Sequence, residues 1–253
     1  MKRKNLFLIL LFFYANFLSA QTVKPEYQKC IKSFIDNVKI DNKEAVAEMV
    51  FYPLKREYPI PDVIDKADFI NRYSEIFDTT LKNEITKSDP GKNWSDMGWR
   101  GIMLNKGNVW MDFDGRLTSV NYQSQAEIDL KKKLNDAQKK ELDSSIAFFQ
   151  KPICVLETEK FRIRIDNLGN ENYRYVSWPI DKAMSEKPDL IIYRGNFVVE
   201  GSGGNHQYEF KKENYTYECA FIVAGEKNPP AAKLTIYQGG KVILSQNAKI
   251  IAK

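Results

Sequence analysis

The chain has 253 residues, which is comfortable for two globular domains of ordinary size. Three of its 38 basic residues lie at positions 2–4, so the rest of the chain carries 35 basic against 33 acidic residues. A balance of +2 is too even for a general nucleic-acid-binding or membrane-surface protein. The one histidine, His206, excludes sites that need two, and the cysteines lack zinc-ligand spacing, so we expect no metal and no cofactor.

Residues 1–20 have the pattern of a cleavable secretory signal peptide. Basic residues at 2–4 precede an apolar run, Leu6–Leu18, and the small residue Ala20 precedes Gln21. That run is about 13 residues long, too short for a bilayer span of ~20 residues. Because Gln21 is not a cysteine, the lipid-attachment pattern of bacterial lipoproteins is missing. We therefore expect a periplasmic or secreted protein with no membrane span after cleavage.

From Pro25 to about Leu81 the apolar residues recur with the period of a helix. The apolar face of a first helix is Tyr27, Ile31, Phe34 and Val38. A second, shorter helix is expected over residues 45–50. Asp65 is placed to cap a third helix. The face of that third helix is expected to continue through Phe69, Tyr73, Ile76, Phe77 and Leu81.

Beyond Pro90-Gly91 the period becomes two, which predicts strands. The three expected strands are Trp99–Leu104, Val109–Phe113 and Arg116–Tyr122. Asp114-Gly115 between the last two is typical of a tight hairpin. Residues 126–150 are again helical and highly charged, and we interpret them as a connecting helix.

From Ile153 to the end of the sequence almost every segment has strand character. In Phe161–Asp166 the alternation is strict, which predicts one buried and one solvated face. Gln238-Gly239-Gly240-Lys241 marks a hairpin. Tyr173, Tyr175 and Trp178 offer an aromatic platform, although core packing is favoured for at least two of them. The predicted fold class is α+β, with a mostly antiparallel β sandwich or small barrel over residues 151–253.

The segment 21–125 resembles the nuclear transport factor 2-like (cystatin-like) family. The resemblance rests on degenerate motifs, namely Asp41-Asn42-Lys43-Glu44-Ala45, Phe51-Tyr52-Pro53-Leu54, Ala67-Asp68-Phe69-Ile70, Gly101-Ile102-Met103-Leu104 and Gly107-Asn108-Val109-Trp110. It implies helices packed on a curved antiparallel sheet with a pocket between them. The family contains enzymes as well as binding or dimerising modules, so the fold does not choose between them.

Enzymes of that family often pair an aspartate with a tyrosine or histidine, and Asp112 or Asp96 with Tyr73 would imitate this arrangement. Asp112 and Asp114 lie beside an expected hairpin turn, where carboxylates are ordinarily solvated or cap backbone amides. We therefore favour a non-enzymatic protein and keep a small-ligand enzyme that uses the N-terminal pocket as an alternative.

The most unusual segment is the glycine-rich loop from Gly201 to Tyr208. Its glycines permit backbone conformations with positive φ and close approach of another molecule. We consider it a candidate site for a ligand or a partner, against the alternative of an ordinary hairpin turn. The candidate residues are Ser202, Gly203, Gly204, Asn205, His206 and Tyr208.

The same loop is faintly similar to the Ser-Gly-x-x-Tyr motif of periplasmic inhibitors of c-type lysozyme. Ser202-Gly203 is followed by Tyr208, two residues farther along than in the motif. This resemblance implies a lysozyme-inhibitor-like protein as a second alternative. For the cysteines, a Cys154–Cys219 disulfide and two buried free thiols both stay open, since export permits disulfides. The leading hypothesis is an exported, non-enzymatic binding or interaction protein with an unknown protein or small-ligand partner.

Overall fold

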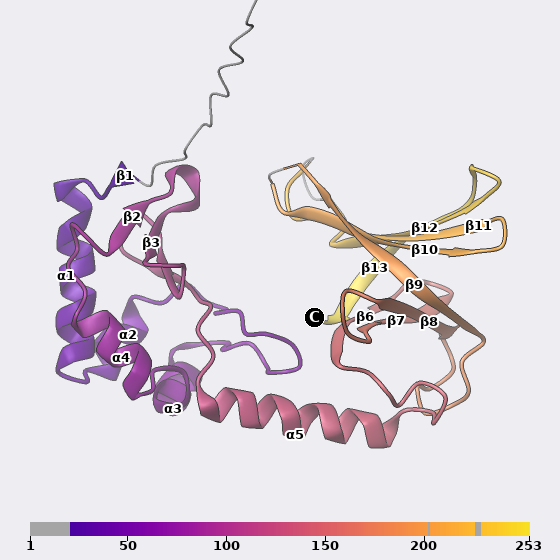
Figure 1. Cartoon of the computed structure of the whole chain (residues 1–253), viewed down its shortest axis with the longest axis horizontal. Helices are drawn as coiled ribbons and strands as arrows, with labels where there is room; N and C mark the ends of the chain where they lie inside the picture. The colour runs from indigo at the N-terminus through magenta and orange to yellow at the C-terminus, as the bar shows by residue number, and fades with distance from the viewer. Residues whose placement is uncertain (1–20, 202, 226–228) are drawn as a thin grey trace, which may run out of the picture.

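The computed structural model describes residues 21–201, 203–225 and 229–253 (Figure 1). The expected signal peptide, residues 1–20, and Ser202 lie outside the described residues. The fold is α+β, as predicted. Helices and a small antiparallel sheet form the N-terminal part, a closed antiparallel barrel forms the C-terminal part, and a long helix runs between them (Figure 1).

The helices of the N-terminal part are α1 (Pro25–Lys39), α2 (Lys43–Glu48), α3 (Lys66–Ile76) and α4 (Thr79–Thr86). Three of them begin at a polar residue whose side-chain oxygen accepts a backbone N–H three positions on. The capping residues Asn42, Asp65 and Asp78 accept at 3.1, 2.9 and 2.9 Å. One helix from Asp65 through Leu81 was the wrong expectation, because the chain leaves α3 at Phe77 and Asp78 starts α4.

The N-terminal sheet has the order β1-β2-β3-β4-β5 and is antiparallel throughout. Its strands are β1 (Gln21–Thr22), β2 (Trp94–Asp96), β3 (Ile102–Leu104), β4 (Val109–Met111) and β5 (Leu117–Val120). A short 3₁₀ turn, Gly98–Arg100, occupies part of the expected first strand. One face of the sheet shares a single hydrophobic core with α1, α3 and α4, so the helices lie against that face.

The barrel closes eight strands in an up-and-down arrangement, each antiparallel to the next along the chain, with the last pairing the first. The strands are β6 (Lys151–Glu157), β7 (Phe161–Asn167), β8 (Tyr173–Pro179), β9 (Leu190–Glu200), β10 (Asn205–Lys212), β11 (Tyr215–Phe221), β12 (Ala232–Gln238) and β13 (Lys241–Ala252). Of the two expected architectures, sandwich or barrel, the barrel is the one that forms. Gly239 and Gly240 make the β12–β13 turn with φ of 56° and 81°, which suits glycine.

A second apolar layer covers the outer face of β7 and β8. Leu142, Ile146 and Phe149 pack there against Val176 and Trp178. As a result Arg164 and Asp166, on the face of β7 expected to be solvated, are 1% and 0% exposed. That expectation was wrong because the alternation of a strand does not reveal a layer packed outside it.

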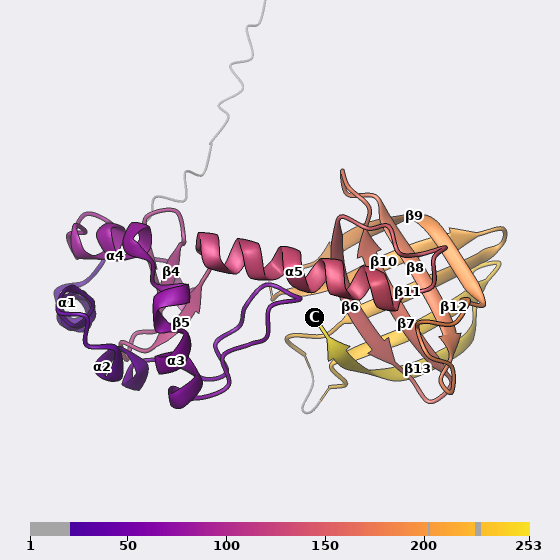
Figure 2. The ribbon, with the colours of Figure 1, turned by 90° about the horizontal axis from the view of Figure 1, so that it is seen from below.

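Helix α5 (Gln125–Glu141) connects the two parts along one side of the molecule (Figure 1). It ends nine residues before the expected boundary, because Leu142 is extended and the Asp143 side chain accepts the N–H of Ser145 at 3.0 Å in a turn. The loop between α2 and α3 reaches along α5 towards the barrel, where Glu57 pairs with Lys151 of β6 at 2.5 Å (Figure 2). Polar contacts therefore join the N-terminal part to the barrel.

Candidate functional site

The glycine-rich segment forms the turn between β9 and β10, and its Asn205 side chain holds a second loop in place. The Asn205 Oδ1 atom accepts the backbone N–H groups of Val223 and Ala224 at 2.8 and 2.9 Å. Its Nδ2 atom donates to the carbonyl of Ala224 at 2.8 Å. The Asn205 amide, which we expected to bind a ligand, therefore forms its hydrogen bonds with the chain's own backbone. Gly203 lies against the same loop, since an added Cβ would lie 3.3 Å from the Cβ of Ala224.

His206 and Tyr208 point to the inner side of the barrel wall rather than outwards from a loop. The His206 ring stacks on Phe221 with centroids 4.9 Å apart and planes 6° apart. Its Nδ1 atom lies 2.8 Å from the carbonyl oxygen of Gly204, and desolvation lowers the pKa of the imidazole. Tyr208 is only 7% exposed and belongs to the barrel core. The candidate residues therefore have different places: Gly203 and Gly204 lie in the turn, Asn205 binds the neighbouring loop, and His206 and Tyr208 lie at the barrel end.

Cys154 and Cys219 both face the barrel interior, and both are free thiols in this structure. Burial raises the pKa of Cys154 to about 12 and that of Cys219 well above its usual range. Neither sulfur is a thiolate at neutral pH, so neither is an activated nucleophile.

The aspartates considered for an N-terminal active site do not meet Tyr73. Asp96 Oδ1 accepts the N–H of Gly98 at 2.9 Å, and Asp112 Oδ1 accepts that of Arg116 at 2.8 Å, as turn residues do. Tyr73 lies in the core, stacked on Phe77 with centroids 5.1 Å apart. The inner face of the sheet is filled by core side chains, so these groups do not form an acid–base pair.

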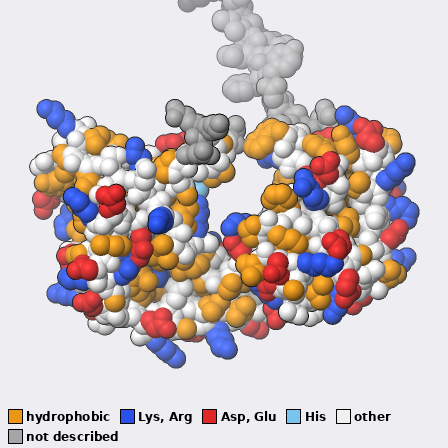
Figure 3. Space-filling model, turned by 180° about the vertical axis from the view of Figure 1, so that it is seen from behind, with side chains coloured by type: hydrophobic (Ala, Val, Ile, Leu, Met, Phe, Trp, Pro, Cys, Tyr) orange, Lys and Arg blue, Asp and Glu red, His pale blue; other side chains and the backbone are white. Residues whose placement is uncertain are grey.

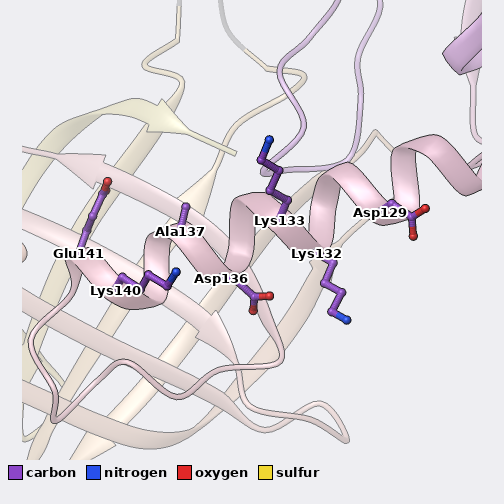
Figure 4. A pocket seen from close by; sticks show the side chains of 7 residues that line it. All are labelled: Asp129, Lys132, Lys133, Asp136, Ala137, Lys140 and Glu141. Carbon is purple, nitrogen blue, oxygen red and sulfur yellow. The ribbon is translucent and has the colours of Figure 1, made fainter.

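Two open hollows lie on the surface of the N-terminal part and of α5. The first, about 540 Å³, lies over the outer face of the sheet and includes Trp99, which is 78% exposed, and Trp110. The second, about 560 Å³, follows charged residues on one face of α5. Figure 4 shows that the side chains of this second hollow fan out from the helix and do not converge on a common point. We interpret it as a solvated helix face; basic and acidic groups are likewise interspersed over the surface in Figure 3.

A more enclosed cavity of about 190 Å³ lies at the barrel end where β7 begins and β8 ends. Phe161, Tyr175 and Tyr217 contribute aromatic side chains from three strands, and the lining also includes Trp178, whose side chain belongs to the layer packed outside β8. Leu190 and Ile236 add aliphatic wall. We call this end, defined by these six residues, the aromatic mouth.

Few polar groups reach the aromatic mouth. Ser177 and Asp189 line it, and the Asp189 carboxylate accepts from Lys182 at 2.7 Å at the surface. Burial raises the pKa of Tyr175 and of Tyr217, so both phenols are neutral hydroxyl groups at physiological pH. Mouths of β-barrels that combine apolar walls with a few polar groups are common ligand sites. The sequence hinted at this site through Tyr175 and Trp178, whereas Tyr173 lies at the other end of β8. Periodicity does not place Phe161 and Tyr217 beside them.

Across residues 21–201, 203–225 and 229–253 no cluster of three or more His, Cys, Asp or Glu side chains is arranged to hold a metal ion. In that part of the chain no helix combines the length and the apolar character needed to cross a membrane. No protein-family model, curated protein or solved structure matches this chain.

Proposed function

We propose that this chain is a non-enzymatic binding protein whose barrel holds a small, largely apolar, ring-containing ligand in the aromatic mouth. The observation that carries the proposal is the cavity of about 190 Å³ at one barrel end, lined by the aromatic side chains of Phe161, Tyr175 and Tyr217. The proposal keeps the class of function expected from the sequence and moves the site from the glycine-rich turn to the other end of the barrel.

The size of the cavity limits the ligand. An apolar protein cavity of ~150 Å³ accepts benzene. A cavity of about 190 Å³ therefore suits a molecule with one ring or a small fused pair of rings. Faces and edges of the Phe161, Tyr175 and Tyr217 rings favour offset or edge-on packing against such a ring.

The polar groups at the mouth select among such molecules. Ser177 is 6% exposed and lines the wall, whereas Asp189 is at the surface. A ligand hydroxyl or amine has a partner at either position, while a ligand carboxylate would meet the Asp189 charge. We therefore expect phenols and aromatic amines to bind more tightly than aromatic acids of the same size.

Isothermal titration calorimetry of residues 21–253 with p-cresol, 2-naphthol and 4-methylbenzoate tests the proposal. We expect saturable binding of the first two and weaker binding of the acid. Ile236→Trp fills the cavity and should weaken binding at least tenfold. Ile243→Trp, on an exposed position of β13, is the matched control and should bind as the unaltered protein does. Absence of saturable binding, or equal binding by Ile236→Trp, would overturn the proposal.

For residues 21–125 we also propose the nuclear transport factor 2-like architecture. The support is that helices share one core with a single face of an antiparallel sheet. Phe34, Phe69 and Phe77 are fully buried in that core, where family enzymes keep a pocket. This filling favours a binding or scaffolding role over catalysis.

Export to the periplasm or medium is proposed on the pattern of residues 1–20 alone, and mass spectrometry of the mature N-terminus tests it.

A further inference from the structure

The barrel end opposite the aromatic mouth carries a second cluster of rings. Tyr173 begins β8 at this end, while Pro179 ends the same strand at the aromatic mouth. Tyr208 contacts Tyr173, Phe197 and Phe221 with ring centroids 4.9, 5.2 and 6.0 Å away. Phe197 is 45% exposed, so the cluster opens to solvent. We call this end, defined by Tyr173, Phe197, His206, Tyr208 and Phe221, the histidine mouth.

An ammonium group already occupies the histidine mouth. The Lys253 Nζ atom lies 4.0 Å from the centroid of the Phe221 ring, well within the range of a cation–π interaction. The same atom lies 3.1 Å from His206 Nε2. Within the described residues Lys253 forms no salt bridge with a carboxylate. Its charge is therefore held by the face of the Phe221 ring and by an imidazole nitrogen.

The backbone prepares His206 for this role. Because Nδ1 lies 2.8 Å from the Gly204 carbonyl oxygen, Nδ1 carries the proton and Nε2 presents its lone pair to the mouth. Desolvation lowers the pKa of His206, the hydrogen bond to Gly204 acts to raise it, and the charge of Lys253 lowers it; the net lowering favours the neutral imidazole. A neutral acceptor beside aromatic faces, without a carboxylate, is a receptor for an organic cation.

We propose that the histidine mouth binds a ligand bearing a primary ammonium group, and that Lys253 is a stand-in which such a ligand displaces. The ring face of Phe221 contacts the cation, and the lone pair of His206 Nε2 accepts one of its N–H groups. The exposed Phe197 and Val199 provide apolar contact for the carbon chain that carries the ammonium. This inference is independent of the aromatic mouth and of its ligand.

Removing the stand-in tests the proposal. We would titrate residues 21–253 with n-butylammonium, which reproduces the end of a lysine side chain, and compare Lys253→Gln with the unaltered protein. We expect Lys253→Gln to bind at least tenfold more tightly. Lys249→Gln, an exposed lysine on β13, is the matched control and should bind as the unaltered protein does. The neutral probe 1-pentanol should bind Lys253→Gln at least tenfold more weakly than n-butylammonium does.

Two further substitutions in the Lys253→Gln background locate the site. His206→Leu removes the acceptor and Phe221→Leu removes a ring face, and each should weaken n-butylammonium binding at least fivefold. Because Phe221 is buried, near-UV circular dichroism is used to check that the Phe221→Leu variant still folds. His206 is less buried, so His206→Leu tests the site with less risk of unfolding the protein. Unchanged binding in Lys253→Gln, equal binding of pentanol, or unchanged binding in His206→Leu would overturn the proposal. Ile236→Trp should not alter n-butylammonium binding, so failure here is distinguishable from failure of the proposed function.

Discussion

The Asp166 carboxylate is completely buried and is shared between two arginines. Its Oδ1 atom accepts from Arg164 Nε at 2.8 Å, and its Oδ2 atom accepts from Arg174 Nη2 at 2.7 Å. Arg174 also donates to the carbonyl of Ile146 at 2.7 Å, and Arg164 donates to Gln138 Oε1 at 3.1 Å. This network joins the outer face of the barrel to α5 and to the segment that follows it.

Asp166→Asn should lower the free energy of unfolding of the barrel by about 3–5 kcal/mol, because two buried guanidinium groups lose their counter-charge. Urea denaturation measures the effect. Asp36→Asn, which breaks an exposed 2.8 Å pair with Lys32, is the matched control and should cost less than about 1 kcal/mol. Similar losses for the two variants would show that burial does not set the energy of this network.

Gly195 permits close packing inside the barrel. A Cβ added at Gly195 would lie 2.1 Å from Cε1 of Phe210, which is fully buried. Gly195→Ala should therefore destabilise the protein by about 1–3 kcal/mol, and Phe210→Leu should recover part of that loss in the double variant. Gly91→Ala, whose Cβ meets nothing closer than 3.4 Å, is the control in the same thermal or urea denaturation. Additive losses in the double variant would contradict the proposed clash.

The burial of individual side chains was the hardest feature to infer from the sequence. The pattern correctly predicted a buried face for the strand that carries Ile163 and Ile165, but its prediction of a solvated face was wrong for Arg164 and Asp166. Alternation reports two faces of a strand, and it carries no information about a layer packed on the outer one. Tyr208 was expected in a binding loop because the glycines before it suggested one, whereas it lies in the wall of the barrel.

At the scale of elements, Glu57 connects the α2–α3 loop to two other elements, α5 and β6. Its carboxylate pairs with Lys131 of α5 at 2.7 Å and with Lys151 of β6 at 2.5 Å. Burial acts to raise the pKa of Glu57, but hydrogen bonds and attraction from the two lysines outweigh it and lower the pKa to about 2. The ionised form is therefore favoured in the folded protein.

Because the folded pKa lies below the ordinary value of 4.5, Glu57 stabilises the protein fully above that value, and the contribution is lost as the pH falls from about 4.5 towards 2. Glu57→Gln should be less stable by about 1 kcal/mol at pH 7. The difference should vanish near pH 2. Urea denaturation of both proteins between pH 7 and pH 2 measures it. Lys131→Gln should reduce the same pH dependence, and a constant difference down to pH 2 would contradict the assignment.

Elements with a strong hydrophobic period and a capping residue were predictable from the sequence. Elements that are very short, or that directly follow another element, were not. The apolar spacing placed α1, and Asp65 placed the start of α3, where the cap forms at 2.9 Å. Helix α4 was missed because Asp78 restarts a helix one residue after Phe77, so the apolar face looks continuous. Strand β2 was missed because three residues are too few to show a period.

For the whole molecule, the N-terminal core and the barrel core have no residue in common. The buried residues of the connecting helix α5 are the polar Glu127 and Asn135. The contacts between α5 and the α2–α3 loop are polar too; for example, the Tyr58 hydroxyl accepts a hydrogen bond from Gln138 Nε2 at 3.0 Å. Polar links transmit less stability than a shared apolar core, so we expect residues 21–125 and 151–253 to unfold as separate units.

Trp94 and Trp178 report on the two units separately. Trp94 is buried in the N-terminal core, and Trp178 is buried in the layer outside β8. In variants that keep only one of these tryptophans and replace the others with Phe, urea unfolding followed by fluorescence should give two different midpoints. Adding Asp166→Asn should shift the Trp178 midpoint to lower urea and leave the Trp94 midpoint in place. Equal shifts at both reporters would instead mean that α5 and its ion pairs couple the two cores into one cooperative structure.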